Sequence, residues 1–170
     1  PVYLWVHNNH AEIRDAREYW GTNCTEATTR FKHDLGADVE VELIGTAGEN
    51  QVRYAATRYG LKNSAGRCGT GAVWGSKNLK AIAARGNRGL PIAHSEEFFA
   101  KGVELRHYLQ QSKVIQVMGR VGTPLLYDVS NYLGAIRTHN SQKPTFEDTL
   151  NAEEIHKYVD KMLSCAGCVV

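Results

Sequence analysis

The sequence predicts an α+β fold, with strands and helices mixed in the amino-terminal half and mostly α-helices in the carboxy-terminal half. Residues 2–7 and 39–43 are rich in β-formers and alternate in polarity, a pattern typical of half-buried strands. Residues 86–91 hold glycine and proline and indicate a boundary. Beyond that boundary strand patterns nearly vanish, and apolar residues recur at helical spacing. We therefore expect two parts of different structural character.

The first half should fold from local signals. Asn8 and Asn9 are turn residues that would join two strands as a hairpin. Thr22 or Thr25 would cap the next helix, and a glycine would end it. The expected elements, in order, are a hairpin over residues 2–14, a helix ending at Gly36, a strand over residues 39–43, a turn at residues 45–48, a strand over residues 51–57 and a strand over residues 79–84.

The second half should be helical. Ser95 can cap its first helix, and Asn151 with Glu154 forms a cap-like pair for its last helix. Residues 137–149 are polar, contain a proline and are expected to form an ordered surface loop. The expected helices cover residues 95–109, 114–118, 125–133 and 151–163. The last of these would lead to Cys165.

The composition is that of a globular protein. The chain has 170 residues, of which 42% are hydrophobic and 22% are charged. Its net charge of +2 comes from interspersed charges without a basic block, so we expect neither nucleic acid nor a membrane as a partner. No apolar run of transmembrane length and no leader pattern is present, which favours a cytoplasmic location. The four cysteines are too few and too irregular for a secreted disulfide framework.

Both ends of the chain suggest a segment of a longer polypeptide. The chain begins without Met, directly in the first strand pattern, and it ends two residues after a CxxC pair. We therefore expect the remainder of its own polypeptide to be a partner of this chain.

The most distinctive stretch is the glycine-rich segment over residues 63–80. Glycines allow positive φ and a close approach of the backbone to an anion. The segment is not a P-loop, because Gly75 is followed by Ser76 and then Lys77, and its glycine order is the reverse of the dinucleotide fingerprint. From spacing alone, two interpretations remain open: a phosphate-binding loop, or a turn that only packs a helix on a sheet.

Cys165 and Cys168 are the only cysteines at metal-ligand spacing. A CxxC pair by itself fits half of a zinc site, a redox pair, two structural thiols or part of an iron–sulfur site. Cys24 lies at a helix start and is expected to be packed. Cys68, beside Arg67, fits either an activated thiol or a small buried hydrophobic residue.

The glycine-rich segment and the motifs before it closely resemble the aldehyde:ferredoxin oxidoreductases, tungsten enzymes that carry a bis-pyranopterin cofactor. The matching motifs follow the family's order and are VYLWV at residues 2–6, EIRDA at 12–16, WG at 20–21, IGTAGEN at 44–50, AGR at 65–67, GAV at 71–73 and GSKNLKAI at 75–82. The resemblance covers roughly the first half of the chain and is thinner over residues 87–164.

The resemblance implies two domain segments. Residues 1–86 would be the second part of the family's amino-terminal, pterin-binding domain, and residues 87–170 would begin the helical domain that ends at the iron–sulfur CxxC. In the family, the loop at AGR contacts the pterin phosphates, and a magnesium ion between the two pterins binds a backbone carbonyl there. This implies cofactor contacts at Asn63, Ser64, Gly66 and Arg67, with the carbonyl of Ser64 as the magnesium ligand. Asn63 replaces a frequent arginine of the family, and Cys68 replaces a usual glycine.

The resemblance also assigns the cysteine pair. The family has a CxxCxxxC motif whose first two cysteines match Cys165 and Cys168, so these would bind a 4Fe-4S cluster together with two ligands beyond this chain. The family's catalytic acid and base lie downstream, and no residue here is assigned as catalytic. Glu49 would cap the following segment or, less simply, take part in catalysis. Residues 127–132 would either line the substrate approach or form an amphipathic helix face.

The implied function is oxidation of a small aldehyde to a carboxylate at a tungsten or molybdenum bis-pterin centre. Electrons would pass through the 4Fe-4S cluster to ferredoxin or another electron-transfer subunit. Two alternatives remain: the active-site subunit of a tungsten-dependent aryl-CoA reductase of the benzoyl-CoA type, and a non-catalytic iron–sulfur or pterin-binding module.

Overall fold

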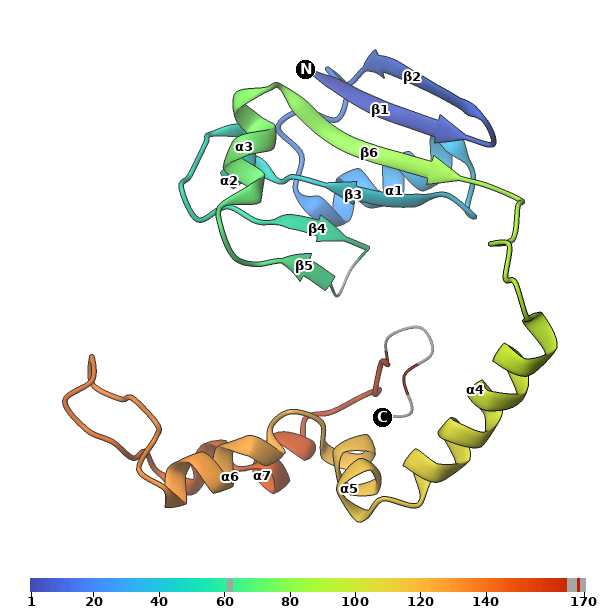
Figure 1. Ribbon diagram of the computed structural model, residues 1–170. Coiled ribbons are helices and arrows are strands. Elements are labelled where there is room, and N and C mark those ends of the chain that lie inside the picture. Colours follow the sequence, from blue (N-terminus) through green and yellow to red (C-terminus); the bar gives the residue numbers. More distant parts are fainter. Residues whose placement is uncertain (61–62, 165–167, 169–170) are drawn as a thin grey trace. The chain divides into compact units, whose positions relative to one another are not determined.

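The structure is a computed structural model that describes residues 1–60, 63–164 and 168. It divides into two compact units, residues 1–90 and 91–170, which are described separately. Unit 1 combines a mixed sheet with helices, and unit 2 is built from helices and loops (Figure 1). The predicted α+β class, with its helical second half, is confirmed.

Unit 1 is organised around a six-stranded sheet with the order β2-β1-β6-β3-β4-β5 (Figure 1). Its strands are β1 (Val2–His7), β2 (His10–Asp15), β3 (Glu40–Leu43), β4 (Thr57–Tyr59), β5 (Asn63–Ala65) and β6 (Leu79–Arg85). β6 pairs in parallel with β1 and antiparallel with β3, and the other neighbouring strands are antiparallel. The last strand in the chain therefore lies in the middle of the sheet, and the short β5 forms one edge.

The core of unit 1 lies between the sheet and the helix α1 (Cys24–Leu35). Alternate residues of β1, β3 and β6 face this helix, as the alternating sequence pattern predicts. The rings of Tyr19 and Phe31 stack with their centroids 3.9 Å apart. Tyr19 donates a hydrogen bond of 2.6 Å to the carboxylate of Asp34. The core side chains include Tyr3, Trp5, Phe31, Val41, Leu43, Ala81 and Ala83.

The helix cap differs from the prediction. The side chain of Asn23, and not of Thr22 or Thr25, caps α1 by accepting a hydrogen bond of 2.9 Å from the backbone N–H of Glu26. Thr22 instead donates its hydroxyl to the carbonyl of Tyr19. Asparagine is a better N-cap than threonine, so intrinsic capping preference favours Asn23 over its neighbours Thr22 and Thr25.

Two predictions between β3 and β4 are wrong. The expected turn at residues 45–48 is the one-turn helix α2 (Thr46–Glu49), and the expected strand over residues 51–57 is a series of turns. Gln51 has a φ of 55°, which no strand permits. Hydrogen bonds from Val52 N–H to the carbonyl of Ala47 (2.9 Å) and from Ala55 N–H to the carbonyl of Val52 (2.8 Å) fold this segment onto itself. The strand β4 begins only at Thr57.

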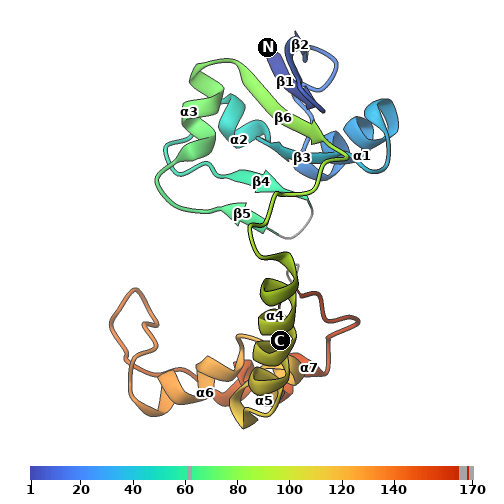
Figure 2. The ribbon, with the colours of Figure 1, turned by 45° about the vertical axis from the view of Figure 1, so that its right-hand side comes forward.

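Unit 2 contains α4 (Ser95–Gln110), α5 (Lys113–Val121), α6 (Leu125–Tyr132), a 3₁₀ turn (Asp148–Leu150) and α7 (Ala152–His156), as Figure 2 shows. The expected positions of the first three helices are confirmed. Asn151 caps α7 through a hydrogen bond of 2.8 Å from the N–H of Glu154, as predicted. That helix nevertheless ends at His156, so the predicted extension to residue 163 is wrong.

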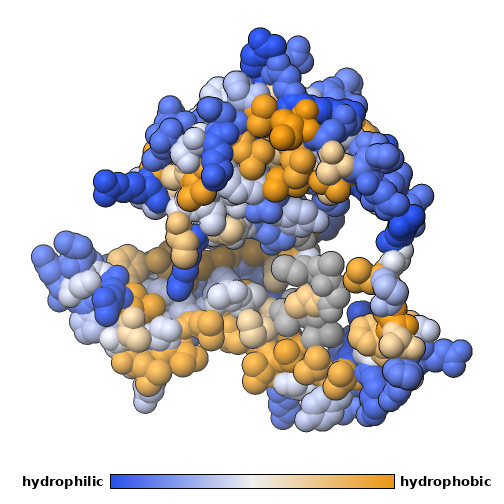
Figure 3. Space-filling model, turned by 45° about the horizontal axis from the view of Figure 1, so that its top comes forward, coloured by the Kyte–Doolittle hydropathy of each residue, from blue (hydrophilic) through white to orange (hydrophobic). Residues whose placement is uncertain are grey.

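The helices of unit 2 expose many apolar side chains. None of the residues of α4 is buried, and Phe99 in this helix is 73% exposed. Hydrophobic patches are visible on the molecular surface in Figure 3. Within the described ranges, no helix combines the length and the apolar character needed to cross a bilayer. The exposed faces are therefore surfaces that the described residues leave uncovered.

The polar loop after α6 is fastened to that helix. The side-chain amide of Asn131 donates to the carbonyl of Phe146 and accepts from its N–H, both at 2.9 Å. The hydroxyl of Tyr127 donates to the carbonyl of Glu147 at 2.6 Å. Residues 127–132 were expected to line the substrate approach or to form an amphipathic helix face, and neither interpretation includes this contact. Two polar residues of the segment hold the following loop.

Replacing Asn131 with alanine should release this loop. The substitution removes two hydrogen bonds, each worth about 0.5–1.5 kcal/mol, so the fold should lose roughly 1–3 kcal/mol. Amide hydrogen exchange should become faster around residue 146 and stay unchanged in unit 1. Gln142→Ala is the control, because it lies in the same loop and its side chain makes no hydrogen bond with a residue that the structure describes. Unchanged amide exchange near residue 146 in Asn131→Ala would show that the side chain of Asn131 does not hold the loop in place.

Candidate functional site

The structure places the predicted cofactor contacts in one short exposed segment. Asn63 and Ser64 lie on the edge strand β5, and Gly66 and Arg67 follow in the loop that leads to the helix α3 (Thr70–Ser76; Figure 1). Residues 64–68 are all exposed. The candidate site, defined here as residues 63–68, is therefore a surface loop at the edge of the sheet.

Both ends of this loop are fixed. Cys68 and Gly69 adopt consecutive left-handed conformations, with φ of 67° and 66°, and turn the chain into α3. The hydroxyl of Thr70 donates to the carbonyl of Ala65 at 3.2 Å and accepts from the N–H of Thr57 at 3.4 Å. The middle of the loop is thus accessible, while its ends are held against β4.

The sequence left two interpretations of the glycine-rich segment open: packing of a helix on a sheet, and phosphate binding. Its glycines differ in which of the two they fit. A Cβ atom on Gly75 would lie 1.8 Å from the carbonyl oxygen of Gly48, and a Cβ on Gly69 would lie 2.1 Å from that of Arg53. A Cβ on Gly71 would also be too close to the backbone, at 2.8 Å from the carbonyl oxygen of Ala56. These glycines serve packing. Gly66 differs, because a Cβ there would meet only the hydroxyl of Ser64 at 3.9 Å, which leaves its backbone open to a ligand.

The chemistry of the loop fits a phosphate-bearing cofactor. Arg67 is exposed and forms no ion pair with any residue that the structure describes. A guanidinium and open backbone N–H groups are the usual donors to phosphate oxygens. Across residues 1–60, 63–164 and 168, no three His, Cys, Asp or Glu side chains converge as a metal site. A magnesium ion at this loop would therefore depend on carbonyl and cofactor oxygens.

A buried ion pair joins α2 to the central strand β6. Lys80 on β6 has a fully buried side chain, and the side chain of Glu49 at the end of α2 is only 5% exposed. The ammonium of Lys80 donates to the carboxylate of Glu49, and to the carbonyl of Thr22 at 3.1 Å. The same carboxylate accepts from the N–H of Gly21 at 2.9 Å. Glu49 is therefore not a simple cap of the following segment but one half of an internal ion pair.

Sequence reasoning did not find the Glu49–Lys80 pair. The two residues are 31 positions apart in the sequence and belong to different motifs. The available signal is Lys80 itself, a charged residue within the otherwise apolar run of residues 79–84 in β6. A buried cation requires a partner, and the acid in the AGEN motif was a candidate for it.

The cysteines have different environments. Burial raises the pKa of the Cys24 thiol, in agreement with a packed residue. Cys68 is exposed, so its interpretation as a buried hydrophobic residue is wrong. Cys165 lies outside the described residues. Cys168 is described and lines a cavity of about 370 Å³ together with Met118, Gly122 and Met162.

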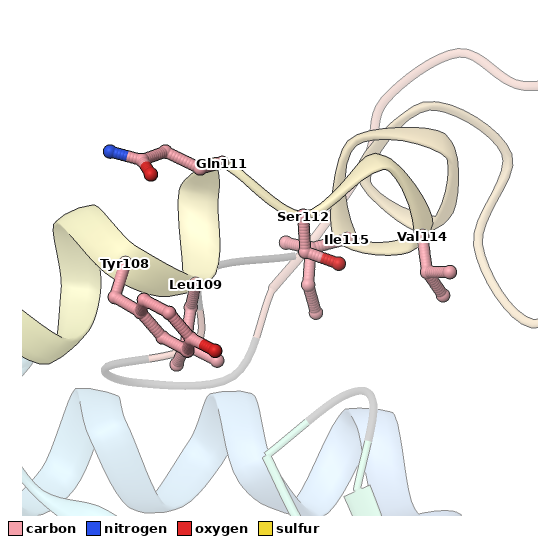
Figure 4. Close-up of a pocket in the computed structure, with 6 residues that line it drawn as sticks. All are labelled: Tyr108, Leu109, Gln111, Ser112, Val114 and Ile115. Atoms are coloured by element: carbon pink, nitrogen blue, oxygen red, sulfur yellow. The ribbon is translucent and has the colours of Figure 1, made fainter.

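A second cavity of about 460 Å³ lies at the turn between α4 and α5. Leu109, Val114 and Ile115 contribute aliphatic groups to it, while Gln111 points away from the other side chains (Figure 4). This lining offers no acid–base pair, and none of the predicted site residues belongs to it. We therefore assign no chemistry to this cavity.

Comparison with known protein families identifies the family to which this fold and this loop belong. Residues 1–86 match the family described as the aldehyde ferredoxin oxidoreductase N-terminal domain. Residues 101–170 match the family described as aldehyde ferredoxin oxidoreductase, domains 2 and 3. The chain therefore belongs to the aldehyde ferredoxin oxidoreductase family, as its motifs indicated.

Individual relatives agree with this assignment. The chain is 35% identical over 178 aligned residues to the tungsten-containing aldehyde ferredoxin oxidoreductase of Pyrococcus abyssi, a match that covers 100% of this chain and 29% of the relative. It is 39% identical over 110 residues to the WOR-like subunit of an aliphatic sulfonate oxidoreductase of Pyrococcus furiosus, covering 57% of this chain and 18% of that protein.

A solved structure is also similar. The active site complex BamBC of benzoyl coenzyme A reductase, in complex with 1,5-dienoyl-CoA, matches with a TM-score of 0.73 and 28% identity. The match covers 98% of this chain and 28% of that chain. This chain thus spans less than a third of the length of the relatives that it matches.

Proposed function

We propose that this chain supplies part of the cofactor-binding site and part of the iron–sulfur cluster site of a tungsten- or molybdenum-dependent enzyme. This enzyme would oxidise an aldehyde to a carboxylate. The observation that carries the proposal is the loop at residues 63–68. It is exposed, fixed at both ends, and presents Arg67 beside the open backbone of Gly66. Membership of the family supports this reading of the loop.

The residues of the loop would bind and orient the cofactor. Arg67 would donate hydrogen bonds to a pterin phosphate, with backbone N–H groups near Gly66 as further donors. The backbone carbonyl of Ser64 would bind magnesium, since carbonyl oxygens are ligands that this hard cation accepts. Asn63 offers an amide in place of a cation. When bound, the metal–pterin group would supply the two-electron oxidation of the aldehyde.

The second unit would contribute to electron transfer. Cys165 and Cys168 would bind two irons of a 4Fe-4S cluster through their thiolates, and two more ligands would come from outside this chain. Met118 and Met162 line the cavity that Cys168 also lines, and such apolar groups limit the access of water. Ferredoxin or another electron-transfer subunit would then accept the electrons one at a time.

A second candidate function is favoured by the structural match to the benzoyl-CoA reductase complex. In this alternative, the same cofactor-binding site would serve the reduction of an aryl-CoA thioester. Assays of the anaerobically purified full-length protein separate the two proposals. Aldehyde oxidation with a viologen acceptor is expected under the first. Absence of turnover on every aldehyde, combined with reduction of benzoyl-CoA, would establish the second.

The Arg67→Ala substitution should lower the pterin and tungsten content of the full-length protein. Loss of a charge-assisted hydrogen bond weakens binding by about 1.5–3 kcal/mol, so cofactor affinity should fall roughly tenfold or more. Metal analysis and pterin fluorescence after oxidation measure the content. Arg88→Ala, at another exposed arginine of unit 1, is the control. Full cofactor occupancy in Arg67→Ala would leave the loop with a packing role only.

A further inference from the structure

The turn at residues 51–56 packs directly against Gly69 and Gly71, which follow the candidate loop in the chain. The N–H of Gly71 donates to the carbonyl of Ala55 at 2.8 Å. The carbonyl oxygen of Arg53 would lie 2.1 Å from a Cβ on Gly69, so only glycine permits this approach. In Figures 1 and 2 the segment between α2 and β4 runs beside the start of α3. Backbone contacts therefore hold the turn against the residues that connect the candidate loop to α3, so the turn and the loop adjoin the same end of this helix.

Two side chains of this turn are available to a ligand. Arg53 is exposed and forms no ion pair with any residue in the described part of the chain. Tyr54, the next residue, is 85% exposed. A large aromatic side chain with so little cover, fixed beside an exposed loop, is a feature typical of recognition surfaces.

We propose that Arg53 and Tyr54 are further cofactor-binding residues, with Arg53 as a second phosphate-binding cation and Tyr54 as an aromatic face for the flat pterin ring system. This inference rests on the function proposed above for the loop. Each phosphate of the proposed bis-pterin cofactor carries about −1.5 to −2 charges at neutral pH, whereas Arg67 and the proposed magnesium ion together supply only about three positive charges. A second guanidinium on the adjoining turn brings the charge of the surface close to that of the ligand.

The backbone geometry makes Arg53 suited to this role. Its carbonyl touches Gly69, and the turn is closed by the hydrogen bond from Ala55 N–H to the carbonyl of Val52 at 2.8 Å. The Cα atom of Arg53 therefore stays at a fixed position relative to the loop, and only its side chain must be ordered on binding. Preorganisation of this kind reduces the entropic cost of binding.

The test uses the full-length protein, produced anaerobically with tungstate. The variants are Arg53→Gln and Tyr54→Ala, with Arg88→Gln and Tyr132→Ala as matched controls at exposed positions, the latter 91% exposed. The readouts are pterin per polypeptide, tungsten per polypeptide and the midpoint of unfolding. We expect both variants to bind cofactor roughly tenfold more weakly than the controls, with unchanged midpoints of the cofactor-free protein.

The outcomes separate this inference from the function on which it rests. If the wild-type protein holds pterin and both variants retain it at the wild-type level, the assignment of Arg53 and Tyr54 is overturned while the proposed function stands. If the wild-type protein holds neither pterin nor tungsten or molybdenum, the proposed function is overturned as well. Should Arg53→Gln fail to fold, Arg53→Met gives the same reading, because it keeps the length of the side chain without the charge.

Discussion

The Lys80→Met substitution is expected to destabilise the fold by about 3–5 kcal/mol, because it leaves a buried carboxylate without its cation. The side chain of Lys80 is fully buried, and that of Glu49 is only 5% exposed. The N–H of Gly21 would remain as a donor to Glu49, but it carries no full charge. Urea unfolding of the chain, followed by circular dichroism, measures the change in the free energy of unfolding.

Two further variants make this test specific. The double variant Glu49→Gln/Lys80→Met should recover much of the lost stability, since a neutral pair carries no uncompensated charge. Lys101→Met removes one partner of a surface ion pair with Glu104, whose side chains are 64% and 66% exposed, and should change stability little. If Lys80→Met costs no more than Lys101→Met, the ion pair does not support the fold.

The Gly75→Ala substitution should be nearly as damaging. A Cβ at this position would lie 1.8 Å from the carbonyl oxygen of Gly48 and 2.7 Å from its carbon. These are backbone atoms of α2, so α2 and α3 must move apart. Overpacking of this kind costs typically about 1–3 kcal/mol, and a contact this short belongs at the upper end of that range or above it.

Gly75→Ala should also disturb the proposed cofactor-binding loop at residues 63–68, because α3 begins shortly after this loop. The midpoint of thermal unfolding should fall, and the pterin content of the full-length protein should fall with it. Gly86→Ala is the matched control, since no atom lies within 4 Å of a Cβ at Gly86. A Gly75→Ala protein with the unfolding midpoint of Gly86→Ala would show that the two helices are not in the close contact described here.

Local patterns in the sequence predicted most of the fold. Alternation gave β1 and β3, helical spacing gave α4 to α6, and Gly36 marked the end of α1. The failures share one cause, which is contact between distant parts of the chain. Residues 51–57 have the composition of a strand, yet residues 51–56 form turns that pack against the start of α3. Tertiary packing overrides local propensity in such segments.

The candidate site was predictable only in part, for the same reason. The residues from Asn63 to Arg67 are consecutive, so one motif could contain them all. Arg53 and Tyr54 lie on a separate turn, and their proximity to the loop follows from the contact between Arg53 and Gly69. The Glu49–Lys80 pair joins two motifs that touch only in the folded chain. No spacing rule relates such residues before the fold is known.

The central claim is that this chain binds a metal–pterin cofactor. The metal and pterin content of the full-length protein after anaerobic purification tests this claim most directly. Tungsten, molybdenum and iron are measured by mass spectrometry, and pterin by the fluorescence of its oxidised form. We expect tungsten or molybdenum together with pterin, and iron from the cluster. Iron in the absence of pterin, tungsten and molybdenum would contradict the claim and would identify a non-catalytic iron–sulfur module instead.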